Sequence, residues 1–245
     1  MSKKTLIVIG NGMVGHHFLE QFVASPAADD FEIIVFGEEK HLAYDRVHLS
    51  GYFSGSTHAD LAMGTADWYA DNNIALKLGE PVLAIDRGHK TVTTPAGRYG
   101  YDELVLATGS YPFVPPIEGN DHERCFVYRT LDDLDAIRAS AKNASTGVVV
   151  GGGLLGLEAA NALKSLGLEA HVVEFAQRLM PVQLDTDGGA VLRGKIEELG
   201  VRVHTEKATT AIVDVEGARL RMNLSDESFL ETDLIVFSAG IRPQD

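Results

Sequence analysis

The sequence contains the same local pattern twice: an apolar strand, a glycine-rich turn and an amphipathic helix. In the first copy, Leu6–Ile9 is predicted to be a buried parallel strand and Met13–Val23 a helix. In the second copy, Val148–Val150 is the predicted strand, and the helix runs from the turn to about Leu166. Both turns have the spacing G-x-G-x-x-G, formed by Gly10, Gly12 and Gly15 in the first copy and by Gly151, Gly153 and Gly156 in the second.

Each glycine of such a turn has its own physical reason. The first allows the turn out of the strand, the second lets the backbone approach a pyrophosphate, and the third lets helix and strand pack closely. The helix N-terminus then faces the negative charge of the phosphates. Two copies, each between a strand and a helix, favour dinucleotide binding over structural turns alone. They predict an FAD and a nicotinamide nucleotide brought face to face, so that a hydride passes from ring to ring.

Composition limits the class of protein. The 245 residues suffice for one large or two ordinary domains, and the apolar share of 45% is ordinary for a globular protein. The formal net charge of -14 argues against nucleic acid and anionic membrane surfaces as partners. Without a bilayer-length apolar run or a signal peptide, we expect a cytoplasmic protein. Cys125 is the only cysteine, so we expect a half-buried small hydrophobe there and no metal site.

The order of predicted elements indicates an α/β fold with two Rossmann-like dinucleotide-binding units, each with a central parallel sheet and a β-meander. The proline-rich stretch 112–116 is predicted to be a stiff crossover. It separates an FAD-binding domain, 1–113, from an NAD(P)H-binding domain, 114–245. Further strands are predicted at 31–36, 74–78, 91–94, 98–101, 103–107, 170–173, 201–204, 211–215, 220–224 and 234–237, with 82–85 continuing the connection after 74–78. Further helices are predicted at 67–71, 131–141 and 190–199.

Acidic residues follow the strand after each glycine turn, where a carboxylate takes the ribose hydroxyls of the adenosine half. In the first unit Glu38 is the candidate, with Glu39 as a competitor and Gly37 as an alternative occupant of the customary position. In the second unit Glu174 ends the strand and favours NAD, because it would repel the 2′-phosphate of NADP. Arg178 leaves NADP as the minority alternative.

Five segments carry a closer likeness to a known family: 10–16, 43–50, 107–112, 150–160 and 240–243. Through them the whole chain resembles the N-terminal part of the large subunit of bacterial NAD(P)H-dependent nitrite reductases, within the FAD-dependent pyridine nucleotide-disulfide oxidoreductase class. The segment from Tyr44 to Ser50 is the most discriminating. Rubredoxin and ferredoxin reductases of the same class have two prolines where Val47 and His48 stand, and a lysine where Gly51 stands.

The resemblance implies which residues contact each cofactor. For FAD, it implies contacts from Gly10, Gly12, Gly15, Glu38, Arg46, Ser50, Val82, Thr108 and Gly109. For the nicotinamide nucleotide, it implies contacts from Gly151, Gly153, Leu155, Gly156, Glu158, Glu174, Ala239 and Gly240. Glu158 is the candidate catalytic residue, because in the family it lies where it reaches the nicotinamide carboxamide. The alternative is an ordinary charge that complements the helix dipole.

Two departures from the class limit what the chain is expected to do. It lacks the redox cysteine pair, so flavin electrons are expected to go to a separate acceptor. In the nitrite reductases this route is siroheme and iron-sulfur clusters, held by C-terminal parts that this sequence does not include. The sequence also stops before the last FAD motif of the class, so we expect the FAD domain to lack its closing piece.

The leading hypothesis is a module that passes electrons from NADH to FAD and feeds nitrite reduction to ammonia in a full-length large subunit. Its partners would be the C-terminal redox domains or a small subunit. One alternative is an NADH-dependent reductase of a small electron carrier, which the charge of -14 disfavours because such carriers are usually acidic. A second is a nucleotide-binding module without turnover of its own.

Overall fold

The computed structural model describes residues 3–217 and 219–244. It divides into two compact units, which are described separately below. The first comprises Met1–Leu49, Ser56–Ser110 and Pro243–Asp245, and the second comprises Ser50–Gly55 and Tyr111–Arg242.

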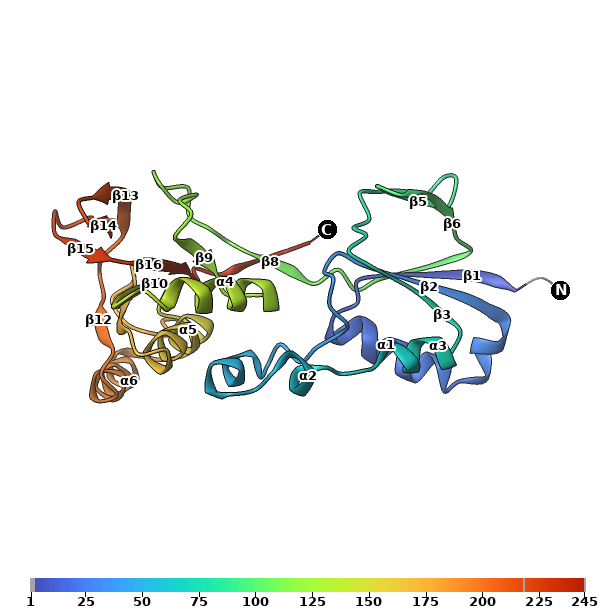
Figure 1. The fold of residues 1–245 in the computed structure, drawn as a ribbon, viewed down its shortest axis with the longest axis horizontal. Coiled ribbons are helices and arrows are strands. Elements are labelled where there is room, and N and C mark those ends of the chain that lie inside the picture. The colour runs from blue at the N-terminus through green and yellow to red at the C-terminus, as the bar shows by residue number, and fades with distance from the viewer. Residues whose placement is uncertain (1–2, 218, 245) are drawn as a thin grey trace. The chain divides into compact units, whose positions relative to one another are not determined.

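The first unit is built on a parallel sheet with the strand order β3-β2-β1-β7. Helices α1 and α3 lie on one face of this sheet, and a small antiparallel sheet of β4, β5 and β6 lies on the other (Figure 1). The elements are β1 (Lys4–Ile9), α1 (Met13–Val23), η1 (Pro26–Asp30), β2 (Phe31–Gly37), α2 (His58–Leu61), α3 (Ala66–Asp71), β3 (Ile74–Leu78), β4 (Ala84–Asp86), β5 (Thr91–Thr94), β6 (Gly97–Gly100) and β7 (Glu103–Leu106).

The last four residues of β1, Leu6–Ile9, are all apolar because both faces of the strand are buried there. Leu6 and Val8 pack with Leu19 of α1 in the core under the helices. Ile7 and Ile9 point the opposite way and pack with Val92 of β5. The sheet therefore has a hydrophobic core on each face. The glycine turn lies at the carboxyl edge of the sheet, which neither core covers.

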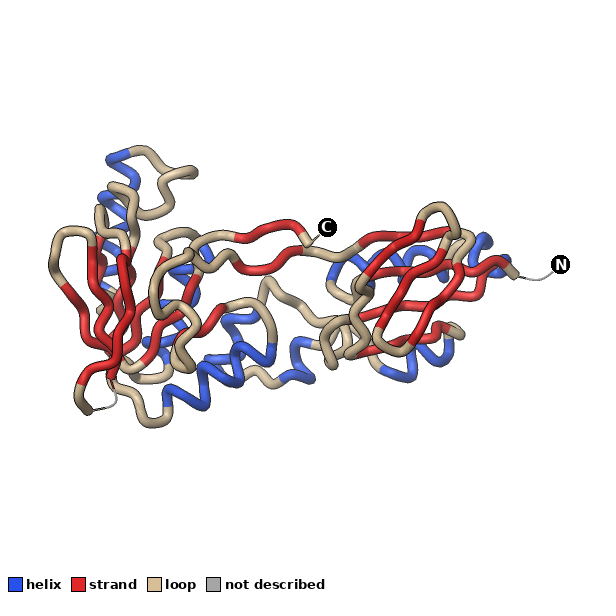
Figure 2. Tube along the Cα trace, turned by 90° about the horizontal axis from the view of Figure 1, so that it is seen from above, coloured by secondary structure: helices blue, strands red, loops and turns tan. Residues whose placement is uncertain are grey.

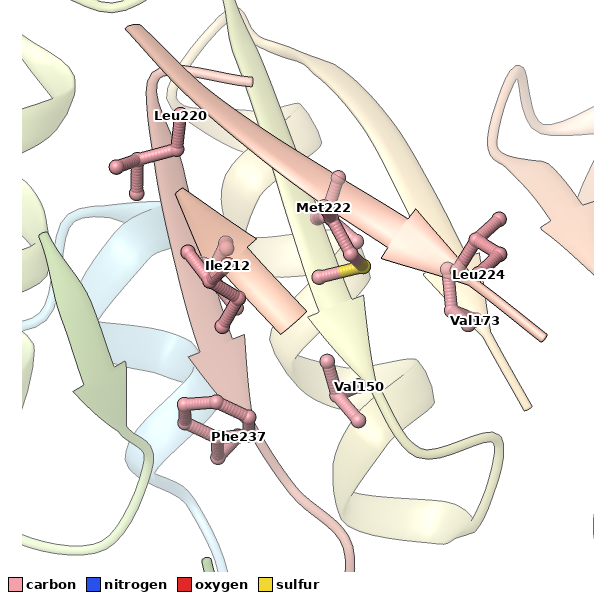
Figure 3. Close-up of a cluster of buried hydrophobic side chains, with 9 residues drawn as sticks. Val150, Val173, Ile212, Leu220, Met222, Leu224 and Phe237 are labelled. Carbon is pink, nitrogen blue, oxygen red and sulfur yellow. The ribbon is translucent and has the colours of Figure 1, made fainter. Parts of the chain in front are cut away.

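The second unit repeats this plan with the parallel order β12-β11-β10-β16-β9 and an antiparallel sheet β13-β14-β15. Figure 3 shows Ile212, Leu220 and Met222 of the antiparallel sheet packed against Val150 and Phe237 of the parallel one. The elements are β9 (Cys125–Val127), α4 (Leu131–Ala141), β10 (Thr146–Val150), α5 (Leu154–Ser165), β11 (Glu169–Val173), α6 (Thr186–Glu198), β12 (Arg202–His204), β13 (Thr209–Val215), β14 (Arg219–Leu224), β15 (Phe229–Thr232) and β16 (Leu234–Phe237).

Three short elements remain. They are η2 (Leu49–Ser54), β8 (Ser110–Pro112) and β17 (Ile241–Pro243). Strands β8 and β17 pair with each other (Figure 2). Across the described ranges, no helix combines the length and the apolar character needed to cross a membrane.

The predicted α/β fold with parallel sheets is confirmed, while several boundaries differ. Helix α6 begins at Thr186 rather than at the predicted residue 190, because the Asp185 side chain accepts a hydrogen bond from the Gly188 N–H at 2.8 Å and caps it. Two glycines in its first turn conceal this start, since glycine is a poor helix former. Strands β9 and β15 and helix α2 were not predicted, because segments this short carry no readable periodicity.

Residues 50–55 belong to the second unit, although the sequence places them among residues of the predicted FAD domain. The Tyr52 hydroxyl donates a hydrogen bond to Asp135, and the Arg138 guanidinium lies over the Tyr52 ring, 5.3 Å from its centroid. The Phe53 ring stacks on Tyr128 at 6.2 Å. The residues that make these contacts are far apart in the sequence, so no local sequence pattern predicts them.

In both units, the start of the strand that leads into the glycine turn is held by an aspartate that precedes the closing strand. In the first, an Asp102 carboxylate oxygen accepts the Thr5 N–H at 2.8 Å. In the second, one oxygen of Asp233 accepts the N–H groups of Ser145 and Thr146 at 2.8 and 2.9 Å. The repeat therefore extends beyond the glycine turns to the opposite edge of each sheet.

We predict that Asp233→Asn lowers the free energy of unfolding by about 1–2 kcal/mol at pH 7, the scale of hydrogen bonds to a charged acceptor. Burial acts to raise the pKa of Asp233, but the Ser145 and Thr146 N–H groups and the Arg219 charge outweigh it, so this pKa lies below 3.8. A depressed carboxyl pKa stabilises the fold above the unfolded pKa, and this stabilisation is lost as the pH falls through the folded value.

The stability deficit of the variant should therefore shrink as the pH is lowered below about 3.8. Urea denaturation at a series of pH values measures it. Asp30→Asn, at an exposed carboxylate, is the control and should change little. A deficit that grows in acid would contradict the assignment.

Candidate functional site

The first glycine turn is fixed to both neighbouring strands. The Gly10 N–H donates to the Phe36 carbonyl at 2.8 Å, and Gly10 has a φ of +108°, which favours glycine. A Cβ atom added to Gly10 would lie 2.1 Å from the carbonyl oxygen of Ala107, and one added to Gly15 would lie 2.0 Å from the Gly10 oxygen. The protein itself therefore requires the first and third glycines.

The second turn has the same geometry. The Gly151 N–H donates to the Val173 carbonyl at 2.8 Å, and the φ of Gly151 is +120°. A Cβ atom added to Gly151 would lie 2.3 Å from the Ser238 oxygen, and one added to Gly156 would lie 1.9 Å from the Gly151 oxygen. The first turn thus lies at the carboxyl end of β1 between β2 and β7, and the second at the carboxyl end of β10 between β11 and β16. In both sheets the strand order changes direction here, and ligands of open α/β sheets bind at such points.

The middle glycine of each turn is different. Gly12 has a φ of -90° and Gly153 one of -80°, which any residue adopts. A Cβ atom added to either would meet no protein atom within 4 Å. Neither backbone conformation nor packing within the described chain explains these glycines. Both glycines leave open space beside the main chain, which a ligand could approach closely.

The helices that follow the two turns also differ from the others. Helices α1 and α5 begin at a glycine N-cap, without a side-chain cap and without an acidic residue in the first turn. Helices α2, α3, α4 and α6 each have both a capping side chain and an acidic residue in the first turn. The positive ends of α1 and α5 therefore lack the internal negative charge that the other four have, which suits an anionic ligand.

In the first unit, the structure separates the two candidate acids. Glu38 is exposed, and its carboxylate accepts a hydrogen bond from the Gln244 side chain at 2.7 Å. The Glu39 carboxylate interacts with other side chains of the protein: it accepts a hydrogen bond from the Tyr44 hydroxyl at 2.6 Å and forms an ion pair with Arg46. Glu38 is consequently the carboxylate that remains accessible at the end of β2.

Arg46, predicted to neutralise a pyrophosphate, already has its charge compensated. Its guanidinium pairs with Glu39 and lies over the Tyr44 ring, 4.9 Å from the centroid. Ser50 belongs to the second unit, so the structure does not group it with the other residues assigned to FAD.

In the second unit, Glu174 is only 5% exposed. Its two carboxylate oxygens accept the Gly152 N–H at 2.6 Å and the Ala176 N–H at 2.8 Å. Glu174 therefore holds the glycine turn in place, a role that the sequence did not indicate. Arg178 donates to the carbonyls of Leu184 and Pro181 at 2.9 and 3.3 Å, so its guanidinium braces the following loop.

Glu158 lies in α5, where burial raises the pKa of its carboxyl group. Tyr128, just after β9, is 5% exposed. Burial raises the pKa of Tyr128, and the negative charge of Glu158 raises it further. The Tyr128 hydroxyl is buried without a hydrogen-bond partner among the residues that the structure describes. Sequence reasoning missed Tyr128, because a lone tyrosine after a short strand gives no signal.

The other predicted residues lie at the ends of central strands or beside them. Val82 packs on the core around Phe36. Leu155 is 37% exposed in the first turn of α5. The remaining candidates follow directly after the closing strands of the two sheets: Thr108 and Gly109 after β7, and Ala239 and Gly240 after β16.

Cys125 is half-buried in β9, as expected. Burial, with the nearby Asp121 charge, raises the pKa of its thiol to about 11, so it stays protonated at neutral pH. Within residues 3–217 and 219–244, no three or more His, Cys, Asp or Glu side chains are grouped to hold a metal ion.

We predict that Gly12→Ala weakens nucleotide binding in the first unit at least tenfold and leaves the second unaffected, because the added methyl projects only into the space of the ligand. Gly153→Ala should do the converse. Gly15→Ala and Gly156→Ala should instead destabilise the fold by about 3 kcal/mol, since each methyl meets a carbonyl oxygen. Titrations with FAD and NADH, alongside thermal unfolding, separate these effects. Equal losses of stability for all four variants would contradict the distinction.

A family sequence profile described as pyridine nucleotide-disulphide oxidoreductase matches residues 4–245. The large subunit of the NAD(P)H nitrite reductase of Klebsiella oxytoca is 58% identical over 100% of this chain, which covers 26% of that relative. The large subunit of the NADH nitrite reductase of Escherichia coli (strain K12) is 54% identical over 100% of this chain, which covers 29% of it. The chain thus spans less than a third of the length of these relatives.

Among solved structures, the ferredoxin reductase for the CYP199A2 system of Rhodopseudomonas palustris is 29% identical. It superposes with a TM-score of 0.87, covering 99% of this chain and 60% of that one. The family match, which extends over nearly the whole chain, agrees with the repeated nucleotide-binding turns. This chain belongs to the pyridine nucleotide-disulphide oxidoreductase family.

Proposed function

We propose that this chain binds FAD in its first unit and NADH in its second, and that it passes electrons from NADH to FAD. The observation that carries the proposal is the pair of middle glycines, Gly12 and Gly153, which nothing in the described protein requires. Their occurrence at the same place in both repeats is expected if each turn accommodates the pyrophosphate of a dinucleotide.

In the first unit, FAD fits the residues present. The main chain around Gly12 and the uncapped N-terminus of α1 suit its pyrophosphate, and the exposed Glu38 suits the ribose hydroxyls. Bound FAD would supply the capacity to take up a hydride from a dihydronicotinamide. Thr108 and Gly109, which follow β7 at the same sheet edge, are proposed to contact it as well.

In the second unit, NADH fits better than NADPH. The Glu174 carboxylate places a buried negative charge at the end of β11, which disfavours an added phosphate nearby. The Arg178 guanidinium donates to the Leu184 and Pro181 carbonyls, so two of its five N–H donors are used to hold the following loop. Glu158 is proposed to contact the nicotinamide, and its raised pKa reflects a partly desolvated position.

We further propose that the electrons serve nitrite reduction to ammonia in a longer protein. The support is the identity of 58% and 54% to two nitrite reductase large subunits over the full chain. Siroheme and iron-sulfur clusters in other parts of such a protein would then receive the electrons. A carrier reductase is not favoured, because the ferredoxin reductase is only 29% identical.

The electron-transfer proposal predicts that the purified chain oxidises NADH with an artificial acceptor such as ferricyanide, and that added FAD increases the rate. Gly12→Ala and Gly153→Ala should each lower this rate at least tenfold, because both nucleotides are needed at once. Initial rates at several FAD concentrations measure it. A rate that is independent of FAD would contradict the proposal.

A chimera tests the nitrite step. This chain replaces the matching part of the Escherichia coli relative, and NADH-dependent ammonia formation from nitrite is measured. We expect activity in the chimera and at least a tenfold loss when it carries Gly153→Ala. A chimera that reduces ferricyanide but forms no ammonia would contradict the nitrite role and leave the NADH-to-FAD role standing.

A further inference from the structure

Phe175, which follows β11, is an exposed aromatic side chain on a firmly held backbone. It is 78% exposed. The Glu174 N–H before it donates to the His204 carbonyl at 2.8 Å, and the Ala176 carbonyl after it accepts the Glu206 N–H at 2.9 Å. The backbone that carries the ring is therefore held in place, while the ring is exposed to water, which is unfavourable for an apolar group.

The same backbone is coupled to the second glycine turn. The Glu174 carboxylate joins the Gly152 N–H to the Ala176 N–H, so residues 174–176 and the turn form one hydrogen-bonded piece. Phe175 lies at the centre of this piece, one residue beyond the position that marks the adenosine half of a dinucleotide site. Its ring is thus attached to a fixed backbone next to the place where the adenosine half of a dinucleotide is expected to lie.

The two units differ at this point in a complementary way. A Cβ atom added to Gly37 would lie 3.3 Å from the Asn11 Cβ, and one added to Gly152 would lie 3.0 Å from the Glu174 Cβ. The space between the glycine turn and the end of the neighbouring strand is therefore filled by Asn11 of the turn in the first unit. In the second unit it is filled by Glu174 at the strand end. The exposed residue that follows this position is Glu38 in the first unit and Phe175 in the second.

We propose that Phe175 is a specificity-determining residue of the second unit, whose ring stacks on the purine base of the bound dinucleotide. The inference rests on the proposed function and adds the recognition of the base. Stacking between a base and an aromatic ring depends on the π-face, so a purine gains more from it than a sugar or a phosphate does.

The test uses the full chain and calorimetric titration with NADH, AMP and nicotinamide mononucleotide. Phe175→Ala should weaken NADH and AMP binding about tenfold, because both carry adenine, and leave nicotinamide mononucleotide unchanged. Phe175→Tyr should retain affinity, since it keeps the ring. Val182→Ala is the matched control, because Val182 is 90% exposed in the same unit and should not affect binding.

Unchanged AMP and NADH affinities in Phe175→Ala would overturn the inference, and so would an equal loss for nicotinamide mononucleotide. In both cases the NADH binding of the unaltered chain keeps the proposed function intact. A failure of the unaltered chain to bind NADH or AMP would overturn the proposed function, and this inference with it.

Discussion

The structure depends on how a glycine turn is fixed between two parallel strands. In the first unit, the Gly10 N–H donates to the strand on one side, and the Ala107 N–H on the other side donates to the Ile9 carbonyl at 2.8 Å. The matching pair in the second unit is made by Gly151 and by the Ser238 N–H, which donates to Val150 at 2.8 Å. Because these bonds connect all three strands at their carboxyl ends, the turn cannot move without disturbing the sheet. A rigid turn can then present its main chain and its helix end to a ligand with little reorganisation.

The two units share this main-chain arrangement but differ in the carboxylates at the end of the neighbouring strand. Glu38 is exposed in the first unit, whereas Glu174 is buried in the second and bonded to backbone N–H groups. A buried carboxylate that accepts two backbone hydrogen bonds holds the local structure in place. Its negative charge still acts on nearby groups, although the carboxylate is not exposed to solvent. The two sites are therefore similar in main chain and different in the side chains that a ligand meets.

Much of this was predictable from the sequence, and the exceptions share a cause. The continuous apolar run in β1 and the glycine spacing predicted the parallel sheets, and α1 occupies the predicted residues 13–23. The role of Glu174 was not predictable, because it depends on the absence of a side chain at Gly152, far away in the chain. The location of residues 50–55 in the second unit likewise depends on the contact of Tyr52 with Asp135. Local sequence patterns predict which strands and helices form. Contacts between residues far apart in the chain depend on the folded unit and cannot be predicted from such patterns.

In each unit, a larger residue on one side of the space between turn and strand end faces a glycine on the other side, and the two units place them oppositely. This packing restricts how the repeat can change in evolution. The first unit pairs Asn11 with Gly37, and the second pairs Gly152 with Glu174. Converting one arrangement into the other needs at least two substitutions, and in the second unit the Leu179 side chain must also shift, because its Cδ2 lies 2.7 Å from an added Gly152 Cβ. The intermediate either crowds two side chains into one space or leaves that space empty. A small void is better tolerated here than an overlap of side-chain atoms in a buried space, so the larger residue must shrink before its counterpart grows. The two glycine turns therefore keep different side chains because of one packing constraint, although their main-chain geometry is the same.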